Sequence, residues 1–212
     1  MLCYSWAMDD AVRRQVALRG KQLEYVTIVW NTIEGLVAVI AGVIAGSISL
    51  IGFGMDSFVE VTSGGAVFWR MTVDADAERR ERNERLTLQI VGFCFIVLAA
   101  YITFESVSDL IRRKAPEHSI AGIVLACISL VVMPLLARAK RKVGTELGIQ
   151  AMKADAKQTD FCFYLSAILL IGLLANAALG WWWADPVSAL VMVPIIAREG
   201  LHSFKGETCE CD

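Results

Sequence analysis

Two carboxylates lie one helical turn apart in the segment GFGMDSFVEV, residues 52–61, inside an apolar stretch that runs from Ser47 to Trp69. Asp56 and Glu60 are four residues apart, so on a helix they share one face. A charged side chain at bilayer depth costs on the order of 3 kcal/mol, so such residues face the interior of a helix bundle and mark functional sites. Two close carboxylates with no Lys or Arg within a turn favour a shared proton, which a divalent cation can displace. The pair therefore predicts a cation site.

A second polar face is predicted in the segment KADAKQTDFCFYLS, residues 153–166. Polar side chains recur there at steps of four, three and four residues, which is the period of one helical face. The members of this stripe are Asp155, Thr159, Cys162 and Ser166. An antiparallel pairing with the helix of Asp56 and Glu60 brings the two polar faces to similar depth in the bilayer.

Other polar residues also lie within apolar segments. Asn31 and Glu34 are one turn apart and are expected to line the same cavity. Asp109 and Asp185 lie near the ends of apolar segments, where a helix–helix hydrogen bond or an interfacial position explains them. The strongest functional candidates therefore remain the acids of residues 52–61.

The composition indicates a protein that crosses a membrane several times. The chain has 212 residues, of which 56% are hydrophobic, and its mean hydropathy is +0.55. Charged residues gather in short clusters between long apolar runs, as expected of a polytopic membrane protein. The net charge of −2 and the lack of a basic stretch interleaved with aromatics exclude a nucleic-acid-binding function. The six cysteines show no paired zinc-finger spacing and predict no disulfide framework.

Six apolar windows predict an all-α bundle of six membrane-spanning helices. Each window is near the ~20 residues that cross ~30 Å of hydrocarbon. The windows are residues 25–45, 47–69, 86–110, 119–137, 154–178 and 183–199. We therefore expect a segment of residues 1–24 before the membrane, one membrane domain of residues 25–199 and a short tail of residues 200–212.

The distribution of Lys and Arg predicts which side the termini face. Basic residues collect before the first window, between the second and third, between the fourth and fifth, and after the sixth. The connector between the fourth and fifth windows contains Arg138, Lys140, Arg141, Lys142 and Lys153. By the positive-inside rule these segments and both termini are cytoplasmic. Trp181, Trp182 and Trp183 then fit an interfacial aromatic belt on the opposite side.

From about Tyr25 to Gly200 the sequence resembles the cation diffusion facilitator family of divalent metal transporters. The matching stretches are EYVTIVWNTIEGLVAVIAGVIAGSISLIGFGMDSFVE, FESVSDLIRRKAPEHSIAGIVLACISLVVMPLLARAKRKVG, KADAKQTD and WWWADPVSALV. Family members have six spans, cytoplasmic termini and a divalent-metal site between spans two and five, and they commonly exchange zinc or another divalent cation for protons. The resemblance implies the same fold in a short form without the family's C-terminal cytoplasmic domain, and a homodimer through the membrane part.

The resemblance also assigns roles to particular residues. Asp56 and Glu60 stand where the family has a pair of metal ligands in its second span. The fifth span departs from the family's His-xxx-Asp or Asp-xxx-Asp pair. One choice of register puts Gln158 and Cys162 at these positions, and a shift of one residue puts Lys157 and Phe161 there. Only the first choice supplies side chains that bind a metal.

Two ligand sets follow for the fifth span. Gln158 and Cys162 complete a four-ligand site with a thiolate, which favours zinc or softer ions. Asp155 and Thr159 make an oxygen-rich site instead, which favours manganese or another harder ion. The candidate metal ligands are Asp56, Glu60, Asp155, Gln158, Thr159, Cys162, Glu34 and Asn31.

The expected function is transport of a divalent metal cation, and the protein is not expected to be an enzyme. A cation from the cytoplasm displaces protons from Asp56 and Glu60, and rocking of the helices exposes the site outward. The expected partners are divalent metal cations (zinc or manganese), protons, a second copy of the chain and the lipid of a plasma or inner membrane. The alternatives are a non-transporting metal sensor or partner subunit, and a proton-coupled exporter of organic cations. The end of the chain, CECD, is interpreted either as a disordered tail or as a low-affinity collecting site for metal.

Overall fold

The computed structural model describes residues 10–72, 77–147 and 150–205, and the structural statements below refer to these residues. They form six helices and no strand. The helices are α1 (Asp10–Ala45), α2 (Ile48–Thr72), α3 (Ala77–Arg112), α4 (Ile120–Leu147), α5 (Gln150–Leu179) and α6 (Ala184–Lys205). The prediction of an all-α polytopic bundle is confirmed, and each predicted window lies within or almost within one helix. The CECD tail lies outside the described residues.

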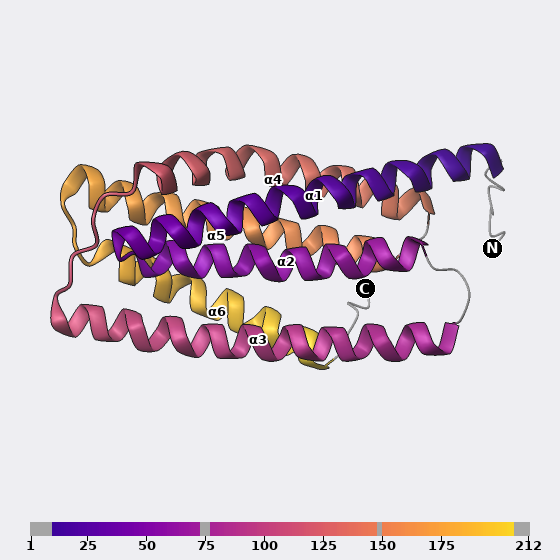
Figure 1. Cartoon of the computed structure of the whole chain (residues 1–212). Coiled ribbons are helices and arrows are strands. Elements are labelled where there is room, and N and C mark those ends of the chain that lie inside the picture. Colours follow the sequence, from indigo (N-terminus) through magenta and orange to yellow (C-terminus); the bar gives the residue numbers. More distant parts are fainter. Residues whose placement is uncertain (1–9, 73–76, 148–149, 206–212) are drawn as a thin grey trace, which may run out of the picture.

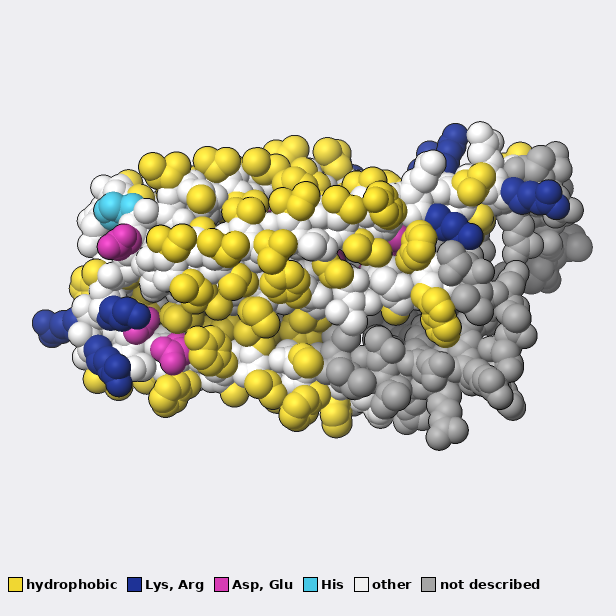
Figure 2. Space-filling model, in the orientation of Figure 1, with side chains coloured by type: hydrophobic (Ala, Val, Ile, Leu, Met, Phe, Trp, Pro, Cys, Tyr) yellow, Lys and Arg dark blue, Asp and Glu magenta, His cyan; other side chains and the backbone are white. Residues whose placement is uncertain are grey.

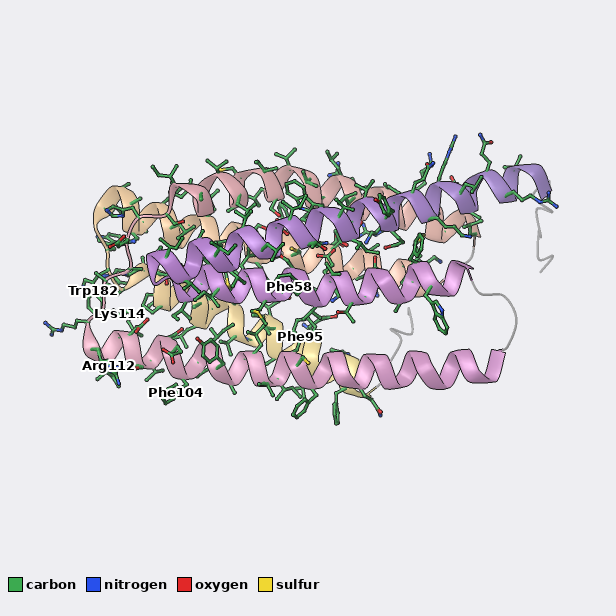
Figure 3. All side chains as sticks on the ribbon, viewed as in Figure 1. Phe58, Phe95, Phe104, Arg112, Lys114 and Trp182 are labelled. Carbon is green, nitrogen blue, oxygen red and sulfur yellow. The ribbon has the colours of Figure 1, made fainter. Side chains whose placement is uncertain are left out.

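Four of these helices are long and apolar enough to cross a membrane: the segments concerned are Arg14–Ala45, Gly92–Arg112, Ile120–Leu147 and Asp155–Leu179. The remaining two, α2 and α6, have 25 and 22 residues and so reach the same length. A helix satisfies all its backbone hydrogen bonds internally, which a spanning segment requires because hydrocarbon offers no partners. On the face shown in Figure 2, hydrophobic side chains are spread along the described part of the bundle, while Lys and Arg gather toward its two ends. Phe104 of α3, for example, points away from the bundle (Figure 3) and is 70% exposed.

The bundle consists of a group of four helices and a pair. Helices α1, α2, α4 and α5 lie side by side, and α3 runs along α6 at one side of this group (Figure 1). The extensive contacts of α3 are with α6, and α2 provides its next largest contact. Helices α1, α3 and α5 begin, and α2 and α4 end, at the same end of the bundle (Figure 1), which we call the terminal end. The polar candidates of α2 and α5 belong to the four-helix group.

Helices α3 and α6 touch through their backbones at two glycines. A Cβ added at Gly92 would lie 2.4 Å from the backbone nitrogen of Phe204 and 2.6 Å from the carbonyl oxygen of Gly200. Small residues permit such close approach between membrane helices, where dispersion contacts replace the hydrophobic effect. A side chain at residue 92 cannot be accommodated by a rotamer change because backbone atoms occupy its place.

Replacing Gly92 by Ala is therefore expected to lower the free energy of unfolding by about 1–3 kcal/mol, the usual cost of overpacking. Gly65 in α2 is the matched control, because a Cβ there meets no atom within 4 Å. Gly65→Ala should be neutral or stabilising, since Ala favours a helix over Gly by about 1 kcal/mol. Thermal unfolding in detergent measures both variants. Equal midpoints for the two would contradict the backbone contact.

The end of the bundle opposite the terminal end is held by Asp185, near the start of α6. Its carboxylate accepts hydrogen bonds from the Ser47 hydroxyl (2.5 Å), from the Ser49 hydroxyl and from the backbone N–H of Ile48 (2.9 Å). The first N–H groups of a helix have no intrahelical acceptor, so Asp185 satisfies the start of α2 from another helix. This contact is the kind of helix–helix hydrogen bond that the sequence suggested for Asp185.

Candidate cation site

The two acids of α2 are both buried among helices. Asp56 is 8% exposed and Glu60 is 1% exposed. The Thr159 hydroxyl of α5 donates to Oε1 of Glu60 at 2.6 Å, while Oε2 is buried without a hydrogen-bond partner. Within the described ranges the structure shows no hydrogen bond or ion pair for Asp56. The pair therefore offers one carboxylate, that of Asp56, without a hydrogen-bond donor or an ion-pair partner among the described residues. In the second, that of Glu60, only one of the two oxygens accepts a hydrogen bond.

Glu34 of α1 connects all four helices of the group. Its Oε1 accepts a hydrogen bond from Ser129 of α4, and its Oε2 accepts one from Ser57 of α2 at 3.1 Å. The Cys162 sulfur of α5 lies 4.0 Å from the same Oε2. Glu34 is fully buried, so this carboxylate brings the polar faces of α1, α2 and α5 to one place. The sequence predicted that Glu34 lines a cavity, but it gave no sign of Ser129 as its partner.

Asn31, one turn before Glu34, is buried with its whole amide group unsatisfied. Neither its amide nitrogen nor its amide oxygen has a hydrogen-bond partner, and the side chain is 0% exposed. Leaving a buried polar group unpaired costs about 1–3 kcal/mol, so such groups normally have a water, an ion or a ligand beside them. Asn31 thus offers an unpaired amide donor and acceptor to a polar guest within the four-helix group.

The polar stripe of α5 divides between two partners. Thr159 and Cys162 contact the acids Glu60 and Glu34, as described above. Asp155 instead accepts hydrogen bonds from Ser63 of α2 (2.9 Å) and from the Lys140 ammonium of α4. Its carboxylate is therefore already neutralised by a cation of the protein itself.

Gln158 is half-buried, and the structure shows no hydrogen bond for its amide within the described ranges. On a helix its position is offset by one residue, about 100°, from that of Thr159, whereas Cys162 lies angularly between the two. Cys162 thus belongs to both ligand sets that the sequence allowed. Within the described ranges the structure shows no polar contact between Gln158 and the acids Asp56 and Glu60.

Five side chains that take part in this network were not among the predicted site residues. They are Glu24, Ser57, Ser63, Ser129 and Lys140. Glu24 falls in the predicted segment before the membrane, yet α1 continues without a break across residue 25 and buries it fully. Lys140 was counted with a basic connector, yet it lies within α4 and its side chain is fully buried. For Glu24 the helical period could have predicted this burial, because Glu24, Thr27, Asn31 and Glu34 follow one another at steps of three and four residues.

The described residues contain no group of three or more His, Cys, Asp or Glu side chains positioned to hold a metal ion together. The acids are distributed instead along the interior of the four-helix group, from Glu24 to Glu34 on α1 and over Asp56 and Glu60 on α2. This arrangement can bind cations through pairs of carboxylates supplemented by hydroxyl, amide or thiol groups. Binding by more than two acids at once requires a change of rotamer or of helix position.

Comparison with known proteins gives a match over most of the chain. A family model described as the cation efflux transmembrane domain matches residues 25–207. An uncharacterised transporter of Methanocaldococcus jannaschii is 26% identical over 178 residues, which cover 81% of this chain and 62% of that protein. The magnetosome protein MamB of Paramagnetospirillum magneticum is 24% identical, and the cation-efflux pump FieF of Shewanella oneidensis is 21% identical. In each case the match covers 77% of this chain and 57% of the relative. The chain thus spans less than two thirds of the length of these relatives.

Proposed function

Because the chain belongs to the cation efflux family, as its resemblance to the cation diffusion facilitators indicated, we propose that it exchanges a divalent metal cation for protons across a membrane. The observation that carries the proposal is the buried pair Asp56 and Glu60, one turn apart on α2. Ionisable residues inside a membrane bundle are costly and persist where they serve a transported ion. The names of two relatives agree with this activity: FieF is called a cation-efflux pump, and the archaeal protein is called a transporter.

The substrate is bound by Asp56 and Glu60 together with groups from α1 and α5. Cys162 is the soft ligand in reach, and it lies against Glu34. A site that uses the thiolate favours zinc, whereas one that uses the carboxylates with Asn31 and Thr159 favours manganese. Gln158 joins the first set. Asp155 joins neither while Lys140 holds it. A homodimer through the membrane helices stays a prediction.

Proton exchange follows from the chemistry of the ligands. Carboxylate and thiolate groups bind a metal only when they are deprotonated, so binding releases protons and the return of protons releases the metal. Lowering the pH on the side where the metal is released therefore favours release, and raising it on the side of uptake favours binding. Alternation between the two sides requires rigid groups of helices to move against each other, and the division into a four-helix group and a pair supports this.

Uptake into proteoliposomes tests the proposal. The full chain is reconstituted with a fluorescent metal reporter inside, a pH gradient is imposed, and zinc, manganese, cobalt and iron(II) are compared. Metal uptake that collapses when the gradient is dissipated is the expected result. Metal binding by calorimetry without uptake of any ion would instead favour a sensor or partner subunit. Uptake of organic cations that metals do not inhibit would favour the organic-cation exporter.

A further inference from the structure

A lysine lies fully inside the four-helix group, surrounded by acids from other helices. The Lys140 ammonium of α4 forms ion pairs with Asp155 of α5 and with Glu24 of α1, the latter at 3.3 Å between Nζ and Oε2. It also lies 3.5 Å from the Thr159 hydroxyl, which donates to Glu60. The side chains of Lys140 and Glu24 are 0% exposed, and that of Asp155 is 1% exposed. We call Glu24, Asp155 and the Lys140 ammonium the inner cluster.

The inner cluster places two buried carboxyl groups against one ammonium. Glu60 is joined to them through Thr159. Both carboxylate oxygens of Glu24 are buried without a hydrogen-bond partner within the described ranges, although Oε2 forms the ion pair with the lysine. A buried charge without full compensation is costly, because its lost hydration is not returned by partners. The inner cluster is therefore a set of cation ligands at which one cation, an amine of the protein, is already present.

The position of the inner cluster separates it from the Asp56 site. Ser63, which binds Asp155, lies seven residues after Asp56 on α2, about 10 Å further along that helix toward the terminal end. A cation that moves from the terminal end toward Asp56 along the polar face of α1 meets Glu24 first, then Asn31 and Glu34. The two sites also differ in chemistry. The inner cluster offers only oxygen ligands, whereas the thiol of Cys162 lies against Glu34, on the side of the Asp56 site.

We propose that Glu24 and Asp155 form a second divalent-cation site, which the ammonium of Lys140 occupies whenever no cation is bound there. Its ligands are carboxylate oxygens, with the hydroxyls of Ser63 and Thr159 beside them, so it takes hard divalent cations such as manganese(II). A cation that binds displaces the ammonium, and the ammonium returns when the cation leaves. As a station on the path to Asp56 this site rests on the proposed transport function. As a binding site it stands on the inner cluster alone.

The first test uses the unmodified chain and asks whether a cation displaces Lys140. A small amine-modifying reagent is applied in detergent with and without saturating manganese(II), and peptide mass spectrometry measures modification of each lysine. Lys142, which is exposed on the same helix, serves as the internal reference. The expected result is that manganese increases the modification of Lys140 several-fold and leaves Lys142 unchanged. Lys140 that stays equally protected at saturating manganese would overturn the proposal.

The second test removes the competing ammonium. In an Asp56→Ala background, which takes away the deeper site, manganese binding is followed by electron paramagnetic resonance. Lys140→Gln is expected to tighten binding about tenfold or more, because a positive charge at contact distance is removed. Adding Asp155→Asn should abolish the gain. Arg141→Gln is the matched control, since Arg141 pairs with Asp160 across the same two helices at an exposed site.

The two proposals fail in different ways. If folded Lys140→Gln binds manganese with the same affinity as the protein that keeps Lys140, the second site is excluded. That result leaves the proposal of proton-coupled transport through Asp56 unaffected. Absence of metal uptake by the unmodified chain sinks the proposed function, and the displacement of Lys140 by manganese can still be observed. Should Lys140→Gln fail to fold, the modification experiment on the unmodified chain decides alone.

Discussion

Replacing Asp56 by Ala is expected to abolish proton-driven metal uptake, with a fall in the initial rate of about 100-fold or more, as for removal of a buried charged group that meets its ligand directly. Asp56 is buried on α2, and the structure shows no partner for its carboxylate within the described ranges. Its removal breaks no hydrogen bond or ion pair of the folded protein there. The loss should therefore appear in transport and in metal binding, with little loss of stability.

Asp160→Ala is the control for this experiment. Asp160 is also an acid of the membrane bundle, but it forms an ion pair with Arg141 at the surface, where both side chains are well exposed. Its uptake rate should stay close to that of the unmodified chain. Metal uptake by folded Asp56→Ala at the normal rate would exclude Asp56 as a ligand that transport requires. Thermal unfolding of the same preparations shows whether each variant is folded.

Replacing Asp155 by Ala is expected to lower the free energy of unfolding by about 3 kcal/mol, because it leaves a buried ammonium with too little compensation. Lys140 would retain only Glu24 and the Thr159 hydroxyl, and the Ser63 hydroxyl would lose its acceptor. The expected effect differs in kind from that of Asp56→Ala. Asp155→Ala lowers stability because it removes an ion pair of the folded protein, whereas Asp56→Ala removes a ligand of the transported cation. Unfolding in mixed detergent and sodium dodecyl sulfate measures it.

The comparison variant is again Asp160→Ala, which removes an exposed ion pair between the same two helices. Exposed pairs of this kind contribute about 0–1 kcal/mol, because water screens them and long side chains lose freedom in forming them. A difference between the two variants of less than about 1 kcal/mol would mean that Lys140 is hydrated in the membrane protein. A large difference supports the dry ion pair on which the inner cluster depends.

Hydropathy was sufficient to predict the number and approximate limits of the helices. The window 47–69 corresponds to α2 (Ile48–Thr72), since apolar composition over one bilayer thickness is a direct consequence of the solvent. Helix ends beyond the hydrocarbon were harder to predict. The window 119–137 became α4, which continues to Leu147 through basic residues because helix formation does not stop where apolar composition does. Lengths were therefore underestimated where charged residues extend a helix.

The candidate site was predictable only in part, because residue type was a poor guide for the charged residues near helix ends. Lys140 stands among basic residues, and a basic cluster ordinarily means a solvated connector. Its burial follows from phase: Met133, Ala137 and Lys140 lie on the inward face of α4. Partners from distant segments, such as Ser129 with Glu34, depend on how four helices pack, and no single-helix pattern contains that information.

One consequence of the fold is mechanical. Helix α6 is fastened near its start to α2 by Asp185, and near its other end it touches α3 at Gly200. Fifteen residues, about 22 Å of helix, separate these two attachments. If α6 tilted by about 10° about the contact of Asp185 with Ser47 as a pivot, that contact would stay in place. Gly200, with α3, would move by about 4 Å. Small angular changes at the pivot thus become displacements of atomic size where α6 contacts α3.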